Sequence, residues 1–363
     1  KITIEEATDA TAANATVINI ASGTQVVVSD SDAVADHDIA AVTVDSVSGA
    51  SATITANIAT GAALTVTDVA DLTINAASAG IASSFGSVVL DATDTTALTV
   101  TGANTAYALE TGAVSGSDKV ATLSASTSTA SGTATLTSMA DADSLTSITL
   151  NADIADITTG AIGSGGDANG LATVTISATG GATATLGDTN ADDTDSTTET
   201  TATITLTADT SSTAVLSTFS ATYGAINLTA TGAGNFTLGG DSDEIKFGEA
   251  STFDLSSATG TNNINVVGAT AAATVTLASE GGTASIQLDD DAVITIANFQ
   301  AGTSGDVLSI DDSGMGVLIQ GAAGTPAASG LEIEELSAAE TLDADDDILV
   351  LVGEVYATTD LVE

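Results

Sequence analysis

The feature that most constrains this chain is a long succession of short runs in which apolar and polar residues alternate. Examples are ALTVT at 63–67, ATVTIS at 172–177 and ATITLT at 202–207. Thr, Val and Ile favour the pleated backbone of a strand, and the Gly, Asp, Asn and Ser between the runs favour turns. Apolar residues at helical spacing are nearly absent. The sequence therefore predicts an all-β protein.

The spacing of the runs leaves two all-β architectures open. Strands recurring every ~8–12 residues are typical both of tandem β-sandwich domains and of solenoids. Sandwiches usually need bulky anchors, but this chain has no Trp and only 2% aromatic residues. A solenoid needs only small aliphatic residues pointing inward, because stacked turns bury a continuous core. We therefore predict a parallel β-solenoid (β-roll or β-helix-like) with a small aliphatic core and turns of about 20 residues; tandem β-sandwich domains are the alternative.

Three regions differ in pattern. Residues 1–50 have fewer Thr-containing alternating runs and are expected to form an N-terminal β region that could serve in assembly. Residues 51–320 carry the repeat and are expected to form the solenoid. Residues 321–363 lose the repeat and contain the only Pro, and are expected to form a C-terminal cap or secretion-signal-like region. A short helix is expected there from Ser329 to Ala339, with Ser329 as its N-cap.

Charge narrows the range of partners. The chain has 48 Asp and Glu but only three Lys and no Arg, for a formal net charge of −45. This charge excludes nucleic acid as a partner, since nothing would neutralise phosphates, and it argues against anionic membranes. No apolar run approaches the ~18 residues of a membrane span. Neutralising the charge would take about 22 divalent cations, so we expect multiple Ca²⁺ ions and an extracellular location.

Acidic clusters at strand ends are the candidate calcium ligands. In DTNADDTDSTTE (188–199), Asp188, Asn190 and Asp192 have the 1-3-5 spacing of a calcium loop, and Glu199 falls at the twelfth position. Asp193 stands where an EF-hand needs Gly, so an EF-hand is not expected. A plainly solvated acidic loop is the alternative for each cluster. The other candidate ligands are Asp241, Asp243, Glu244, Asp289, Asp290, Asp291, Asp311 and Asp312.

Two segments resemble a known family. GGDSDEIKF (239–247) resembles the glycine-aspartate nonapeptide of RTX proteins, with Ser242 in place of the third Gly and Glu244 in place of the Asp. ITIANFQAGTSGDVLSIDD (294–312) resembles the pattern that closes the repeats of type I-secreted RTX and S-layer proteins. The residues that carry this second resemblance are Ile296, Phe299, Gly302, Asp306, Leu308 and Ile310.

Other segments resemble the same family in the general pattern of their residues. The runs LTSITL, LTVTGAN and INLTATG resemble the β-solenoid of calcium-dependent bacterial S-layer proteins. The tail at 345–363 resembles the C-terminal region in which such proteins carry an uncleaved export signal. The resemblance implies bound calcium, type I secretion and a place at the cell surface.

The residue types for catalysis are poorly represented. His37 is the only His, lies between Asp36 and Asp38, and is expected to be exposed in an acidic loop. Without Cys it cannot build the usual zinc site, and no Ser-His-Asp arrangement is suggested. There is no Arg to hold an anionic substrate, and the three Tyr are scattered. We therefore expect no enzymatic activity.

These features predict a structural protein of the cell surface. We expect a subunit of an S-layer or extracellular filament, forming a homo-oligomer ordered by calcium and in contact with a cell-surface polysaccharide. A type I-secreted RTX-like adhesin is the alternative. An ice-binding protein is a third reading, because Thr-x-Thr pairs recur at 53/55, 65/67, 99/101, 173/175, 203/205 and 274/276. Ordinary strand propensity on a solvated face explains those pairs equally simply.

Overall fold

The described part of the chain consists of strands and turns. The computed structural model describes residues 1–5, 13–29, 39–58, 61–76, 82–91, 93–102, 108–128, 132–164, 168, 170–191, 201–221, 224–239, 245–266, 271–288, 293–300, 305–310 and 351–352. Within these ranges there is no helix, and hence none that could cross a membrane. The helix expected at 329–339 lies outside the described residues.

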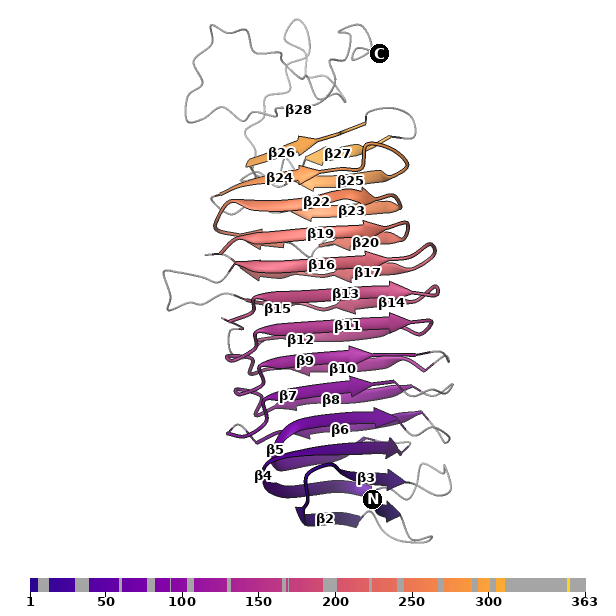
Figure 1. Ribbon diagram of the computed structural model, residues 1–363, viewed down its shortest axis with the longest axis vertical. Helices are drawn as coiled ribbons and strands as arrows, with labels where there is room; N and C mark the ends of the chain where they lie inside the picture. Colours follow the sequence, from indigo (N-terminus) through magenta and orange to yellow (C-terminus); the bar gives the residue numbers. More distant parts are fainter. Residues whose placement is uncertain are drawn as a thin grey trace, which may run out of the picture.

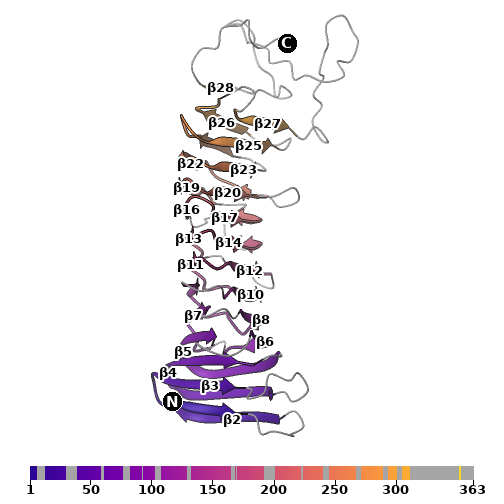
Figure 2. The same ribbon diagram turned by 90° about the vertical axis from the view of Figure 1, so that its right-hand side faces the viewer.

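The strands wind into a parallel β-solenoid of about 10 turns, which confirms the predicted fold class. Figure 1 shows the turns stacked along one long axis, with the N-terminal strands at one end. Figure 2 shows from the side that each turn contributes to two stacks of strands that face one another. Every strand pair in the described residues is parallel, and each strand pairs with the strand one turn away. Tandem sandwiches are thereby excluded for this part of the chain.

We call the two sides the first and second stacks. Two long strands run through both stacks, namely β4 (Ile39–Asn57) and β5 (Ala62–Ala76). The first stack also contains β1 (Ile2–Glu5), β3 (Thr24–Ser29), β7 (Ala97–Thr101), β9 (Thr122–Ser126), β11 (Ser147–Asp153), β13 (Thr173–Thr179), β16 (Ala202–Ala208), β19 (Ile226–Gly232), β22 (Ser251–Ala258), β24 (Ala272–Thr276), β26 (Val293–Ala297) and β28 (Leu351–Val352).

The second stack is more often interrupted. It contains β2 (Ala13–Ile20), β6 (Ser83–Val89), β8 (Leu109–Ser115), β10 (Ala134–Met139), β12 (Ile157–Ile162), β14 (Thr183–Leu186), β15 (Thr189–Asn190), β17 (Thr213–Leu216), β18 (Phe219–Ala221), β20 (Asn235–Leu238), β21 (Ile245–Phe247), β23 (Thr261–Val266), β25 (Thr283–Leu288) and β27 (Val307–Ile310). Strand β4 crosses the predicted boundary between residues 50 and 51 and pairs with β5 on both sides of it.

The turns range from 20 residues, between Ile54 and Ile74, to 30, and several are longer than the predicted length of about 20. Leu98, Leu123 and Ile148 occupy the same position in successive turns, so these turns are 25 residues long rather than about 20. The step from Val174 to Ile204 takes 30 residues and includes part of the acidic segment after Ala191. The longer turns contain additional residues at the corners that connect the two stacks.

The core is built by stacking like on like. In β13 and β16 every second residue is buried, because successive strand residues point to opposite faces. The buried positions are mainly Val, Ile, Leu and Ala, as predicted. Five of the six Phe are also fully buried, and the rings of Phe247 and Phe253 lie 5.9 Å apart. The small aliphatic core thus carries aromatic packing as well.

A column of close backbone contacts interrupts the second stack. Its strands lose regular pairing around Gly86, Gly112 and Gly160, where the backbones of neighbouring turns come unusually close. A Cβ atom on Gly112 would lie 2.0 Å from the Gly86 carbonyl oxygen, and one on Gly160 would lie 1.8 Å from the Thr137 carbonyl oxygen. Only a residue without a Cβ fits at these two positions.

We therefore expect Gly160→Ala to lower the free energy of unfolding by about 3 kcal/mol or more, because its Cβ would overlap a carbonyl that cannot move away. Gly170→Ala is the matched control, since a Cβ there would make an ordinary contact of 3.5 Å with the Leu145 carbonyl oxygen. That control should change the value by less than about 1 kcal/mol. Denaturant unfolding followed by circular dichroism measures both; equal effects would contradict the close contact.

Candidate metal centre

Three aspartates meet at one corner of the solenoid. Asp68 lies where β5 passes from the second stack to the first, and Asp91 and Asp94 lie in the turn from β6 to β7. Each offers a carboxylate oxygen, and the three oxygens lie within 4.8 Å of one another. All three side chains are partly exposed. These residues could hold a metal ion.

The turn that carries Asp91 and Asp94 is fixed by local hydrogen bonds. The amide and hydroxyl of Thr93 donate to Asp91 Oδ1 at 2.9 and 2.7 Å. The Thr95 hydroxyl donates to the Val69 carbonyl at 2.8 Å, which ties the turn to β5. Asp68 itself has a φ of 57°, a conformation that Asp tolerates better than most residues. The conformation of the backbone therefore sets the position and orientation of these aspartates.

Stacking brings the negative charges together. Asp71 pairs with Ala97, so Asp68 and Asp94, each three residues earlier, occupy the same position in consecutive turns. A hydrogen bond to the Asp94 carboxyl raises the pKa of Asp68, and burial and the charges of Asp94, Asp45 and Asp91 raise it further. Hydrogen bonds from Thr93 lower the pKa of Asp91. Asp68 therefore retains its proton to a higher pH than an isolated aspartate does.

The donor set suits a hard divalent cation. Calcium binds carboxylate oxygens at 2.3–2.6 Å, so oxygens on opposite sides of one ion lie about 4.8 Å apart. Three carboxylates would provide part of its six to eight ligands, and carbonyl oxygens or water would complete the shell. A site built only of oxygen is unsuited to zinc or copper, which favour nitrogen or sulfur.

Other carboxylates have a different role: they accept backbone N–H groups from a neighbouring turn. Asp156 accepts the amide of Thr183 at 2.7 Å, and Asp209 accepts that of Gly180 at 2.9 Å. The Ser212 hydroxyl and this amide lower the pKa of Asp209. These carboxylates join consecutive turns without a metal.

Asp306 belongs to the same group and is largely buried. Its two carboxylate oxygens accept the amides of Ala284 and Gln300, each at 2.8 Å. It is also the Asp of the family-like pattern in 294–312. The structure therefore gives this residue a hydrogen-bonding role between turns, whereas sequence analysis had singled it out only by resemblance.

Most of the predicted calcium ligands lie outside the described residues. Asp188 is exposed just before β15, and Asn190 lies within β15. The structure describes none of the other candidates, which are Asp192, Glu199, Asp241, Asp243, Glu244, Asp289, Asp290, Asp291, Asp311 and Asp312. His37 also lies outside the described residues.

Sequence analysis missed the three-aspartate corner, although a signal was present. TDVADLT (67–73) and TDTTALT (93–99) both place Thr-Asp at the same distance before Leu-Thr. Aligning the two segments stacks Asp68 on Asp94.

Comparison with protein-family models, curated proteins and solved structures gives no match for this chain.

Replacing Asp68 tests the metal centre. Asp68→Asn keeps a residue that tolerates the positive φ but removes a charge from the cluster. We expect it to raise the melting temperature in EDTA by about 2 °C or more, and to weaken calcium binding at this corner at least about tenfold. Asp71→Asn is the control, because it removes an exposed charge from the same strand outside the cluster. Differential scanning calorimetry measures the melting temperature, and calcium titration measures the affinity. If both quantities are the same for the two variants, the cluster does not bind calcium.

The raised pKa of Asp68 also predicts a pH dependence. Without calcium, its stabilising contribution is fully present below its ordinary pKa of 3.8 and is lost as the pH rises through the raised value. The melting temperature of the wild-type protein in EDTA, relative to that of Asp68→Asn, should therefore fall as the pH rises from 3.5 to about 7. A difference that is constant over this range would contradict the raised pKa of Asp68.

Proposed function

We propose that this chain is a self-assembling structural protein of the cell surface, a subunit of a surface layer or extracellular filament that is ordered by calcium. The observation that carries the proposal is the stacking of Asp68 on Asp94 beside Asp91 at a solenoid corner. A solenoid stacks its turns along one axis, so acidic residues at the same position of consecutive turns come close together, as they do at this corner. A divalent ion shared by such turns replaces their repulsion with attraction.

The shape of the molecule supports a mechanical role. The described turns form a straight stack (Figure 1), and their hydrophobic core is continuous from one turn to the next. Each turn contacts mainly its neighbours, so stiffness depends on every junction being satisfied. A cation held by Asp68, Asp91 and Asp94 would stiffen the junction that their mutual repulsion weakens. The proposed role is therefore to bear load and present repeated surfaces.

The overall charge supports dependence on cations. A formal net charge of −45 opposes the approach of two copies in water at low ionic strength. Millimolar calcium outside cells would screen and bridge these charges, so assembly would be confined to that compartment. Export by type I secretion and contact with a cell-surface polysaccharide remain part of the proposal, on the strength of the resemblance in 294–312 and 345–363.

We expect millimolar calcium to convert the protein from dispersed particles into ordered sheets or filaments, and EDTA to reverse the change. Light scattering after size exclusion and negative-stain micrographs measure assembly, and circular dichroism measures folding. Sodium chloride at matched ionic strength is the control for screening alone. If EDTA leaves both the spectrum and the assembly state unchanged, the calcium mechanism is wrong. If calcium yields only isolated particles, the adhesin alternative is favoured.

A further inference from the structure

The outer face of the first stack carries hydroxyl groups in register. Five of the six Thr-x-Thr pairs lie on this stack, and 65/67 lies on the second. One column contains Thr122, Ser147, Thr173, Thr203, Asn227, Thr252, Thr274 and Thr295. Its neighbour contains Thr99, Ser124, Thr149, Thr175, Thr205, Thr229, Asp254 and Thr276.

This surface, which we call the hydroxyl face, comprises the outward residues of β7, β9, β11, β13, β16, β19, β22, β24 and β26. It is nearly free of charge. Along these strands, all of which the structure describes, the only acidic residues are Asp153 and Asp254. Yet the whole chain has a formal net charge of −45. The other acidic residues that the structure describes lie in turns or on other strands, so the hydroxyl face is where another acidic molecule can approach with little repulsion.

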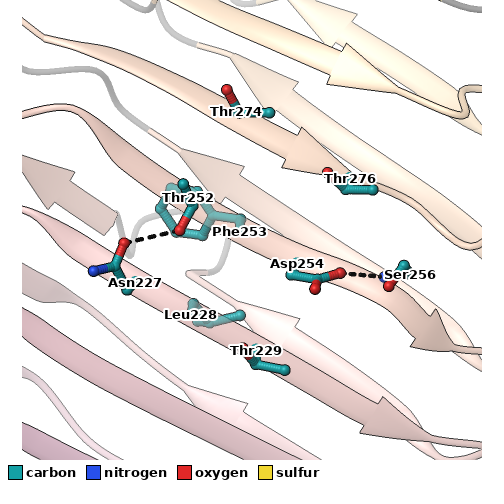
Figure 3. Close-up of a pocket in the computed structure, with 9 residues that line it drawn as sticks. All are labelled: Asn227, Leu228, Thr229, Thr252, Phe253, Asp254, Ser256, Thr274 and Thr276. Atoms are coloured by element: carbon teal, nitrogen blue, oxygen red, sulfur yellow. Dashed lines mark hydrogen bonds between the residues drawn. The ribbon is translucent and has the colours of Figure 1, made fainter.

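The hydroxyl face is also regular. Between β7 and β19 the pairing runs without a register shift, whereas the second stack is broken at its glycine column. Among the strand pairs of the first stack from β7 to β26, the register shifts only between β19 and β22. A depression of about 390 Å³ lies at this place and is bordered by Thr229, Thr252 and Asp254; Figure 3 shows these side chains. The Ser256 amide holds the Asp254 carboxylate at 3.0 Å.

We infer that the hydroxyl face packs against the same face of a second copy, and so forms the lateral contact of the proposed assembly. A hydroxyl both donates and accepts hydrogen bonds, so a lattice of Thr is complementary to itself, as a two-fold symmetric contact requires. The Thr methyl groups supply apolar area between the hydroxyls. Two such faces would stack about 10 Å apart, as packed sheets do.

The available area is sufficient for a stable contact. Nine strands spaced by about 4.8 Å span about 40 Å, and five residues of each strand span about 17 Å, or roughly 700 Å² in all. A standard-size interface buries about 800 Å² per partner. The inference rests on the proposed function, because the turns that flank the face need cations before two copies can approach.

A charge placed at the centre of the hydroxyl face tests the inference. Thr205→Glu should raise the dissociation constant for self-association in calcium at least about tenfold, since like charges would meet across the contact. Thr185→Glu is the matched control, because it adds the same charge to the outer face of β14 in the second stack. Sedimentation equilibrium measures both, and circular dichroism verifies that each variant folds.

A second measurement does not depend on the stability of the Glu variants. The chain has no Cys, so Thr205→Cys and Thr185→Cys each accept a single nitroxide label. Dipolar coupling between copies is expected in calcium for the label at 205 and not for the label at 185.

The outcomes separate the two proposals. If the wild type assembles in calcium but the 205 and 185 variants behave alike, the hydroxyl face is not the contact and the proposed function stands. A wild type that stays monomeric in calcium overturns both proposals. In that case, thermal hysteresis would assign the face to ordered water, and retention on a neutral polysaccharide column would assign it to a saccharide.

Discussion

Parallel stacking in register is the constraint on which this structure depends, because it places each side chain above its counterpart in the preceding turn. For the inward column from Leu98 to Ile148 the result is favourable, since aliphatic side chains pack on their own kind. For outward Thr it is neutral or favourable. For carboxylates it is unfavourable, because like charges are brought within a few ångströms of one another. Parallel stacking therefore restricts the positions at which this sequence can place acidic residues.

Two arrangements of carboxylates occur among the described residues. Asp156, Asp209 and Asp306 accept backbone amides of a neighbouring turn, which turns a negative charge into a junction between turns. Asp68 and Asp94 instead lie close to each other and to Asp91, where a hydrogen bond to Asp94 and the neighbouring charges raise the pKa of Asp68. The first arrangement joins turns through hydrogen bonds to carboxylates, whereas the second places like charges together at the corner that we propose calcium occupies. The strands of the hydroxyl face carry only Asp153 and Asp254 as acidic residues, and this is the surface that we propose receives a second copy.

Much of the fold could be predicted from the sequence, because alternation with period two in runs such as ATITLT specifies strands and their buried side. The scarcity of aromatic residues correctly favoured a solenoid over sandwiches. The length of a turn could not be predicted, since it depends on corner residues that carry no alternation. Asp68, Asp91 and Asp94 were missed for the same reason: Asp68 is 23 residues from Asp91, and only the register brings them together. Clusters of acidic residues adjacent in the sequence, such as Asp289–Asp291, were predicted as calcium ligands, whereas single acidic residues that only the stacking brings together were not.

The central claim is that a divalent cation bridges the stacked carboxylates of Asp68, Asp91 and Asp94. A crystal structure determined in millimolar calcium, with anomalous scattering to locate the metal, tests it most directly. The account predicts an anomalous peak at about 2.3–2.6 Å from oxygens of Asp68, Asp91 and Asp94. A map with no peak among those three carboxylates would contradict it.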